Sequence, residues 1–187
     1  KKIHSPNSPT KAWEADWDGL WRLLTFDLPA SDTLSRSRLR DWLKALRFGK
    51  VQGSVWINHR SLETIRQSFA QLSIPPDNIL CMEGRFWNHH SDPQCVEKAW
   101  PLNRMQEAYA TYLRFLDRQA PQAPGLESYQ AWKAQEQKLW DNALSLDPLL
   151  PRKSWPQSIR GPNPALEAEA RREQAIRAWR DSTLHWA

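Results

Sequence analysis

The stretch from Trp17 to Ile57 constrains the fold more than any other part of this 187-residue chain. An apolar run at residues 20–28 is long enough for a buried strand and is closed by Pro29. Four apolar residues then recur at helical spacing, which places them on one helix face: Leu39, Trp42, Leu43 and Leu46. Gly49 breaks this helix, and residues 51–57 resume strand character.

The following residues extend the pattern to a complete small domain. Helical spacing of apolar residues predicts a helix over residues 60–72, and residues 78–86 fit another strand. If the strand region after Gly49 is a hairpin bent at Gly53, the order is βαββαβ, the split βαβ arrangement. We therefore expect an α+β protein with a ferredoxin-like domain at residues 17–96.

Beyond residue 96 the pattern is helical. Six residues step along one helix face for four turns: Leu102, Met105, Tyr109, Tyr112, Leu113 and Leu116. A second helix is expected around residues 129–143, and Asn163 as N-cap before Pro164 predicts a third. These helices predict an α-helical C-terminal domain at residues 97–187.

Residues 1–16 are polar and contain prolines, so we expect a linker there. The chain holds 12 Trp, several times the usual share for this length. We favour the interpretation that large aromatics fill the cores of two small domains and the seam between them. The alternative is a dedicated aromatic binding surface, such as a pocket between the domains with Arg at its mouth.

Charge and cysteine usage restrict the surroundings of the protein. The formal net charge of +5 helps polyanions to approach, whether nucleic acid or the phosphates of a nucleotide-like ligand. Cys81 and Cys95 give no disulfide framework and fit a reducing compartment. No stretch is apolar enough for a membrane span, and no signal peptide is visible. We expect a cytoplasmic protein without a membrane partner.

One predicted helix is basic. Four of its side chains are candidate nucleic-acid contacts, because Arg and Lys can follow a phosphate backbone: Arg36, Arg38, Arg40 and Lys44. The alternative, which we favour, is a solvated helix face. No aromatic motif of an RNA-recognition or single-strand platform accompanies these charges.

Potential metal ligands gather in one stretch at Cys81, His89, His90 and Cys95. Their spacing matches neither the Cys-x-x-Cys nor the His-x₃₋₅-His pattern of zinc sites, so we expect no metal. Ser54 and Ser154 lack the strained Gly-x-Ser-x-Gly turn of a nucleophile. The six Gly are scattered and form no phosphate loop. We expect no enzyme, no catalytic residue and no resident cofactor.

Several segments resemble the central domain of PaaX-type regulators, the repressors of phenylacetate degradation: residues 17–21, 26–29, 38–40 and 48–57. The same residues are similar to the small CRISPR-adaptation subunit, whose ferredoxin-like fold that domain shares. Residues 147–151, followed by Trp155 and Pro156, resemble the regulators' C-terminal helical domain, which the CRISPR subunit lacks.

The resemblance implies a function. PaaX-type regulators release DNA on binding phenylacetyl-coenzyme A, so we expect a homodimer that senses an acyl-coenzyme A as small-molecule effector. The resemblance assigns no residues to the ligand pocket. The family reads operator DNA through an N-terminal winged helix, and no helix-turn-helix pattern precedes Trp17. We therefore expect operator binding only through an upstream winged-helix domain that is absent here.

The alternative is a metal-dependent nuclease or CRISPR-adaptation-like subunit. The resemblance to the CRISPR subunit implies that Asp27, at the end of the first strand, could bind a divalent cation with its symmetry mate. Only Asp32 lies nearby as a second acidic residue. We favour a structural role for Asp27, with its carboxylate accepting backbone N–H groups of its own loop.

Overall fold

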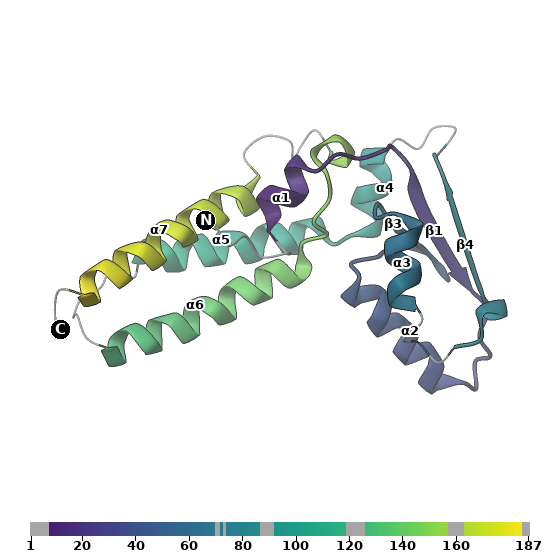
Figure 1. Ribbon diagram of the computed structural model, residues 1–187, viewed down its shortest axis with the longest axis horizontal. Coiled ribbons are helices and arrows are strands. Elements are labelled where there is room, and N and C mark those ends of the chain that lie inside the picture. The colour runs from purple at the N-terminus through teal and green to yellow at the C-terminus, as the bar shows by residue number, and fades with distance from the viewer. Residues whose placement is uncertain are drawn as a thin grey trace. The chain divides into compact units, whose positions relative to one another are not determined.

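A computed structural model describes residues 8–69, 72, 74–86, 92–118, 126–156 and 163–184 (Figure 1). The protein is α+β, with a four-stranded antiparallel sheet and a helical C-terminal region, which confirms the predicted fold class. The chain divides into two compact units. The sheet unit comprises residues 15–100 and 150–157, and the helical unit comprises residues 1–14, 101–149 and 158–187.

The sheet unit contains the predicted split βαβ order. Its principal elements are β1 (Trp21–Phe26), α2 (Thr33–Ala45), β2 (Gly49–Gln52), β3 (Val55–Asn58), α3 (Leu62–Phe69) and β4 (Ile79–Gly84). The strands lie in the order β2-β3-β1-β4, and all neighbours are antiparallel. The predicted hairpin joins β2 to β3, and Gly53 has a φ of +48° in its turn, a conformation that glycine adopts without strain. Shorter elements complete the unit: η1 (Pro76–Asn78), α4 (Asp92–Ala99) and η2 (Arg152–Ser154).

Helix α2 shows why this segment folds as predicted. Asp32 caps its N-terminus, because the Asp32 carboxylate accepts the backbone N–H of Ser35 at 3.1 Å. The prediction that Gly49 ends the helix is wrong, because α2 already ends at Ala45. The left-handed backbone after the helix is that of Arg47, with a φ of 63°, whereas Gly49 already begins β2.

The two faces of the sheet are covered differently. One face packs under α2 and α3 around a core of Leu24, Phe26, Leu28, Leu39, Leu43, Phe48, Trp56, Ile65 and Ile74. The strand register places Leu23, Ile57 and Gly49 on the opposite face. There α4 packs against β2, and Trp100 lies so close to Gly49 that a Cβ would come within 2.5 Å of its ring.

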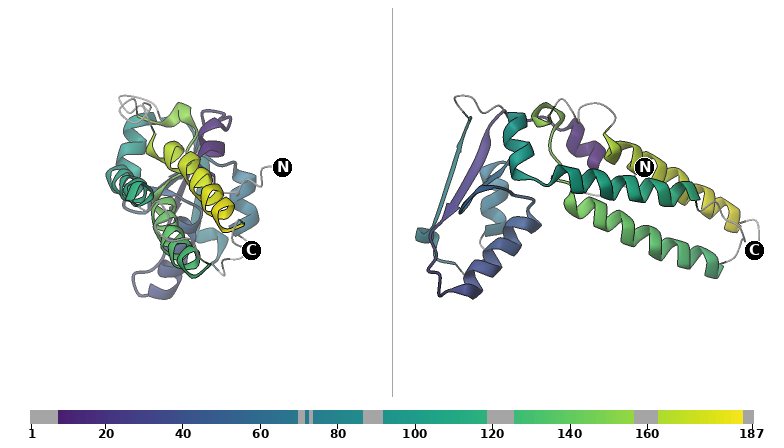
Figure 2. Two further views of the ribbon diagram at one scale, coloured as in Figure 1. Left: turned by 90° about the vertical axis from the view of Figure 1, so that its left-hand side faces the viewer. Right: turned by 180° about the vertical axis from the view of Figure 1, so that it is seen from behind.

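The helical unit is built from three long helices and one short one. They are α5 (Leu102–Arg118), α6 (Leu126–Leu146), α7 (Pro164–Leu184) and α1 (Pro9–Glu14), and Figure 2 shows the three long helices side by side. As predicted, Asn163 caps α7, and its side chain accepts the backbone N–H of Ala165 at 3.0 Å. The structure differs from the expected linker at residues 9–14, which form α1 and pack on α7. No helix within the described ranges is long and apolar enough to cross a membrane.

Buried polar side chains hold the long helices in register. The Glu136 carboxylate is fully buried and accepts hydrogen bonds from Tyr112 Oη at 2.9 Å and from Arg172 Nε at 2.6 Å, while Lys133 forms an ion pair with it. Burial acts to raise the pKa of Glu136, but Arg172 and Lys133 hold it below the usual value. Glu136 is therefore charged at neutral pH, and its bonds join α6 to α5 and α7.

The segment that resembles the regulators' C-terminal domain has a structural explanation. Asp147 is buried and accepts the hydroxyl of Tyr109 at 2.9 Å and the backbone N–H of Leu149 at 2.8 Å. These bonds fix the bend after α6, where Leu149 has a φ of 52°.

Tryptophan mainly supplies core volume. Seven of the described Trp side chains are buried: Trp21, Trp56, Trp100, Trp132, Trp140, Trp155 and Trp179. For these residues the interpretation that aromatics fill the cores of two small units is confirmed.

Candidate functional site

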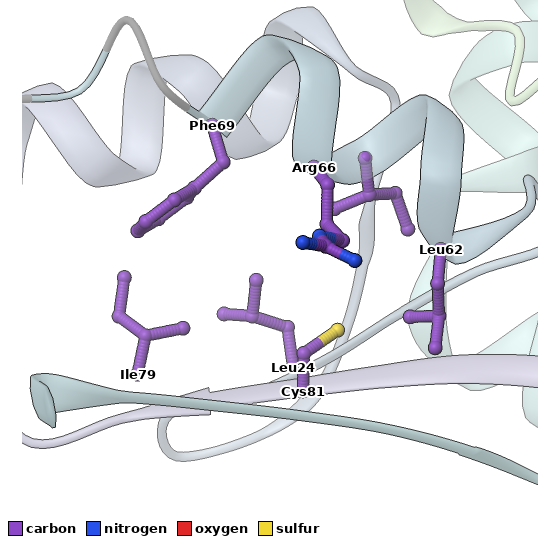
Figure 3. Close-up of a pocket in the computed structure, with 7 residues that line it drawn as sticks. Leu24, Leu62, Arg66, Phe69, Ile79 and Cys81 are labelled. Atoms are coloured by element: carbon purple, nitrogen blue, oxygen red, sulfur yellow. The ribbon is translucent and has the colours of Figure 1, made fainter. Parts of the chain in front are cut away.

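A pocket of about 230 Å³ lies between α3 and the strands β1 and β4 (Figure 3). Seven side chains line it: Leu24, Leu62, Ile65, Arg66, Phe69, Ile79 and Cys81. Protein interiors are packed with few voids larger than a water molecule, so a space of this size within the sheet unit is a candidate binding site.

The pocket follows from how α3 meets the edge of the sheet. The register pairs Leu24 with Cys81 and Phe26 with Ile79, so these side chains of β1 and β4 face the helices. Ile65 anchors α3 and is buried, whereas Leu62 and Phe69 on either side of it are only partly buried. The short helix therefore leaves an open space over β1 and β4.

Two polar groups face this apolar space. Figure 3 shows the guanidinium of Arg66 on the strand side of α3, between Phe69 and Leu62 and facing Leu24 and Cys81. Arg66 is exposed and makes no hydrogen bond or ion pair with any residue that the structure describes. Burial raises the pKa of the Cys81 thiol, so the thiol is protonated at neutral pH. The site thus offers an unpaired cation and a neutral thiol over an apolar floor.

The other face of β4 is also exposed. Leu80 and Met82 lie on it, with 55% and 46% of their surfaces accessible, and they pair with Thr25 and Leu23 of β1. Since β4 is an edge strand, its outer backbone groups have no neighbouring strand within the described chain. The edge at β4 is therefore apolar on one face and hollow beneath α3 on the other.

A buried ion pair fixes the far end of β4. The Arg22 side chain is buried and lies 2.6 Å from the Asp18 carboxylate and 3.2 Å from that of Glu83. The hydrogen bond from Arg22 lowers the pKa of Asp18, and burial lowers the pKa of His59 to about 4. These charges tie β1 to β4 and require no ligand.

Asp27, the candidate ligand under the nuclease alternative, lies exposed after β1. Its backbone N–H donates to the carbonyl of Asn78 at 3.0 Å. Its carboxylate makes no hydrogen bond with the described residues, so the predicted side-chain bonds within its own loop are not formed there. Asp32 caps α2 instead. The described residues contain no group of three or more side chains that could hold a metal ion.

The basic side chains predicted on one helix do lie on α2. Arg36 donates to the carbonyl oxygen of Leu28 at 2.7 Å, which gives it a structural role. Arg38, Arg40 and Lys44 are exposed. Nucleic-acid binding by these four residues stays a prediction.

Among the described residues, the remaining candidates do not come together in one site. His89 and His90 lie outside the described residues, Cys81 lines the pocket, and Cys95 is buried in α4. Ser54 lies 3.1 Å from the hydroxyl of Thr25, and the buried Ser154 donates to the carbonyl of Pro151 at 2.8 Å.

Sequence reasoning missed the pocket, although one signal was present. Arg66 lies on the apolar stripe of α3, four residues after Leu62 and three before Phe69. A charged residue at an interior position of a stripe indicates that this part of the face is not closed. The helical spacing of Leu62, Ile65 and Phe69 predicts an apolar helix face but does not reveal the space beside Arg66.

The sheet order and the two helices on one face define a ferredoxin-like domain. Residues 14–96 match the family described as the PaaX protein central Cas2-like domain, as the resemblance of these segments predicted. Among solved structures, the chain is similar to "Uncharacterized protein Rv0674 from Mycobacterium tuberculosis", with 17% identity and a TM-score of 0.61. That match covers 94% of this chain and 68% of the other, and it supports the fold. No curated protein matches the sequence.

Proposed function

We propose that this chain is the dimerising and effector-sensing part of a PaaX-like transcriptional repressor and that it binds an acyl-coenzyme A such as phenylacetyl-coenzyme A. The observation that carries the proposal is the match of residues 14–96 to the central domain of PaaX proteins. A domain of this family suggests a regulator rather than an enzyme. No observation on Asp27 favours a nuclease over this function.

The exposed face of β4 supports dimerisation. An edge strand that carries Leu80 and Met82 in solvent is a liability for a monomer, because another strand or apolar surface can join it. A second copy of the same face is self-complementary, as a two-fold dimer requires. DNA binding is assigned to an upstream winged-helix domain, with the basic side chains of α2 as an additional phosphate contact.

Calorimetric titration with phenylacetyl-coenzyme A tests effector sensing. We expect saturable binding in the micromolar range that requires the acyl group, so free coenzyme A is the control. Absence of both heat and thermal stabilisation would overturn the phenylacetyl assignment. Other acyl thioesters and Mg²⁺-dependent cleavage by wild-type and Asp27→Asn protein would then be measured.

Sedimentation velocity tests dimerisation. Met82→Glu places a charge on the proposed interface, and we expect it to shift a dimer to monomer. Leu34→Glu is the matched control, because Leu34 is also an exposed large apolar residue, 61% accessible, but lies at the start of α2. Equal effects of the two variants, or a wild-type monomer at all concentrations, would refute this interface.

A further inference from the structure

We infer that the pocket beneath α3 binds a small carboxylate whose apolar part is about the size of one aromatic ring. This inference concerns a site that is separate from the acyl-coenzyme A proposal and does not depend on it. It rests on the volume of the pocket, on its apolar lining and on the charge of Arg66, which has no partner among the described residues.

The size of the pocket sets the size of the ligand. A cavity of about 150 Å³ lined by apolar side chains stays dry and takes up benzene. The pocket of about 230 Å³ therefore has room for a ring and a short chain of a few further atoms. A nucleotide-bearing molecule such as coenzyme A is much too large to enter it.

The side chains that line the pocket determine which chemical group can enter it. Leu24, Leu62, Ile65, Phe69 and Ile79 present only carbon to the space, and Figure 3 shows Phe69 and Ile79 directed toward each other from opposite walls. An apolar group gains by leaving water for such a space, and an aromatic ring also gains by packing against the ring of Phe69. A sugar or another strongly polar ligand would lose its water hydrogen bonds there without replacement.

Arg66 sets the charge of the ligand. Its guanidinium lies over the apolar floor and has no carboxylate partner among the described residues, while the nearby Glu63 accepts a hydrogen bond from Gln67 at 3.0 Å. A guanidinium binds a carboxylate through two parallel hydrogen bonds, so an anionic group at the open side satisfies it. The protonated thiol of Cys81 adds a weak donor and leaves binding non-covalent.

Protection of Cys81 from a thiol reagent tests the inference directly. Cys81 lines the pocket and is exposed, whereas Cys95 is buried, so the fast-reacting thiol of the native protein reports on the pocket. The probe is 3-phenylpropionate, and its neutral amide, 3-phenylpropionamide, is the matched control ligand. We expect millimolar or lower concentrations of the carboxylate to slow labelling of Cys81 saturably, with weaker protection by the amide. Cys81→Ser supplies the background from Cys95.

Arg66→Met separates the anion contact from general packing. It retains an apolar stem and removes the charge, so we expect at least a tenfold loss of affinity for the carboxylate and little change for the amide. Arg40→Met is the matched control, since it removes the same charge from α2, where Arg40 is exposed and does not line the pocket. Equal losses in both variants would mean that net charge, not the pocket, attracts the probe, and would overturn the inference.

Two further outcomes would also overturn it. Cys81 labelling that is unaffected by either ligand at millimolar concentration would mean that the pocket takes no such molecule. Labelling that slows with protein concentration alone would mean that a second copy of the chain fills the pocket. Titration with phenylacetyl-coenzyme A is a separate measurement, so its failure would leave this result standing.

Discussion

The two edges of the sheet are built in opposite ways. At the β2 edge, Gly49 is buried against the ring of Trp100, and α4 covers the strand. At the β4 edge, Leu80 and Met82 face solvent, and α3 leaves a pocket over Cys81. The same sheet therefore has a tight contact at Gly49 of one edge strand, and exposed apolar side chains beside a pocket at the other.

On the other face of the sheet, the two helices α2 and α3 also differ in how much they bury. Helix α2 has 13 residues and buries Leu39 and Leu43 completely, whereas α3 has 8 residues and buries only Ile65. A two-turn helix supplies too few side chains to fill the space beside an edge strand. Side-chain burial under α2 therefore contributes more to stability, whereas the space under α3 can accept a ligand.

The largest loss of stability is expected when a core side chain under α2 is shortened. Leu43→Ala removes a completely buried side chain and leaves a cavity, so it should lower the free energy of unfolding by about 3 kcal/mol. Leu62→Ala, the matched variant in α3, should cost about 1 kcal/mol because its side chain already borders open space. Urea denaturation followed by circular dichroism measures both. Equal costs would show that the pocket is closed in solution.

Glycines at the two edges give the next largest effect. Gly49→Ala drives a Cβ into the Trp100 ring and should destabilise the protein by about 2 kcal/mol, in the range of overpacked cores. Gly84→Ala meets no atom within 4 Å and should leave stability unchanged within about 0.5 kcal/mol. Thermal unfolding of the two variants beside the wild type checks this, and similar losses would contradict a tight contact at Gly49.

The core under α2 could be predicted from the sequence, but the contacts at the two sheet edges could not. Apolar spacing at Leu39 and Leu43 predicts a buried helix face because a complete stripe has only one favourable environment. The tight contact of Gly49 with Trp100 joins residues 51 positions apart, and no local pattern encodes it. The pocket depends on how far α3 reaches over β4, which is a property of packing in three dimensions.

The polar candidates show the same limit. The resemblance to the CRISPR subunit points to Asp27 at a strand end, but a metal site requires several side chains to converge, and the described residues contain no such group. Conversely, the sequence presents Cys81 as a free thiol or a metal ligand, whereas its place on the helix-facing side of β4 lets it line the pocket. Spacing along the chain identifies residue types, whereas the register of the sheet decides which of them meet.

Filling the pocket should raise the free energy of unfolding, by less than the losses described above. Cys81→Ile adds apolar volume to the pocket and a β-branched residue to a strand, so it should raise the free energy of unfolding by about 1 kcal/mol. Leu39→Phe, the corresponding enlargement under α2, should instead destabilise the protein by about 1–3 kcal/mol. Chemical denaturation gives both values, and a destabilised Cys81→Ile variant would show that the pocket cannot accept added volume.

The smallest effect concerns reactivity rather than stability. Burial raises the pKa of both Cys81 and Cys95, so each thiol is less ionised near pH 8 than in the unfolded chain, and the native protein should react more slowly than the denatured one. At Cys81 the charge of Arg22 opposes this shift and that of Glu83 reinforces it. Labelling should accelerate as pH rises toward the raised pKa, by roughly tenfold per unit where the thiolate is a minor species. Cys81→Ser and Cys95→Ser proteins assign each rate to one thiol. We expect exposed Cys81 to react first and buried Cys95 to react only on unfolding. Equal rates in the native protein would show that the two thiols are equally accessible.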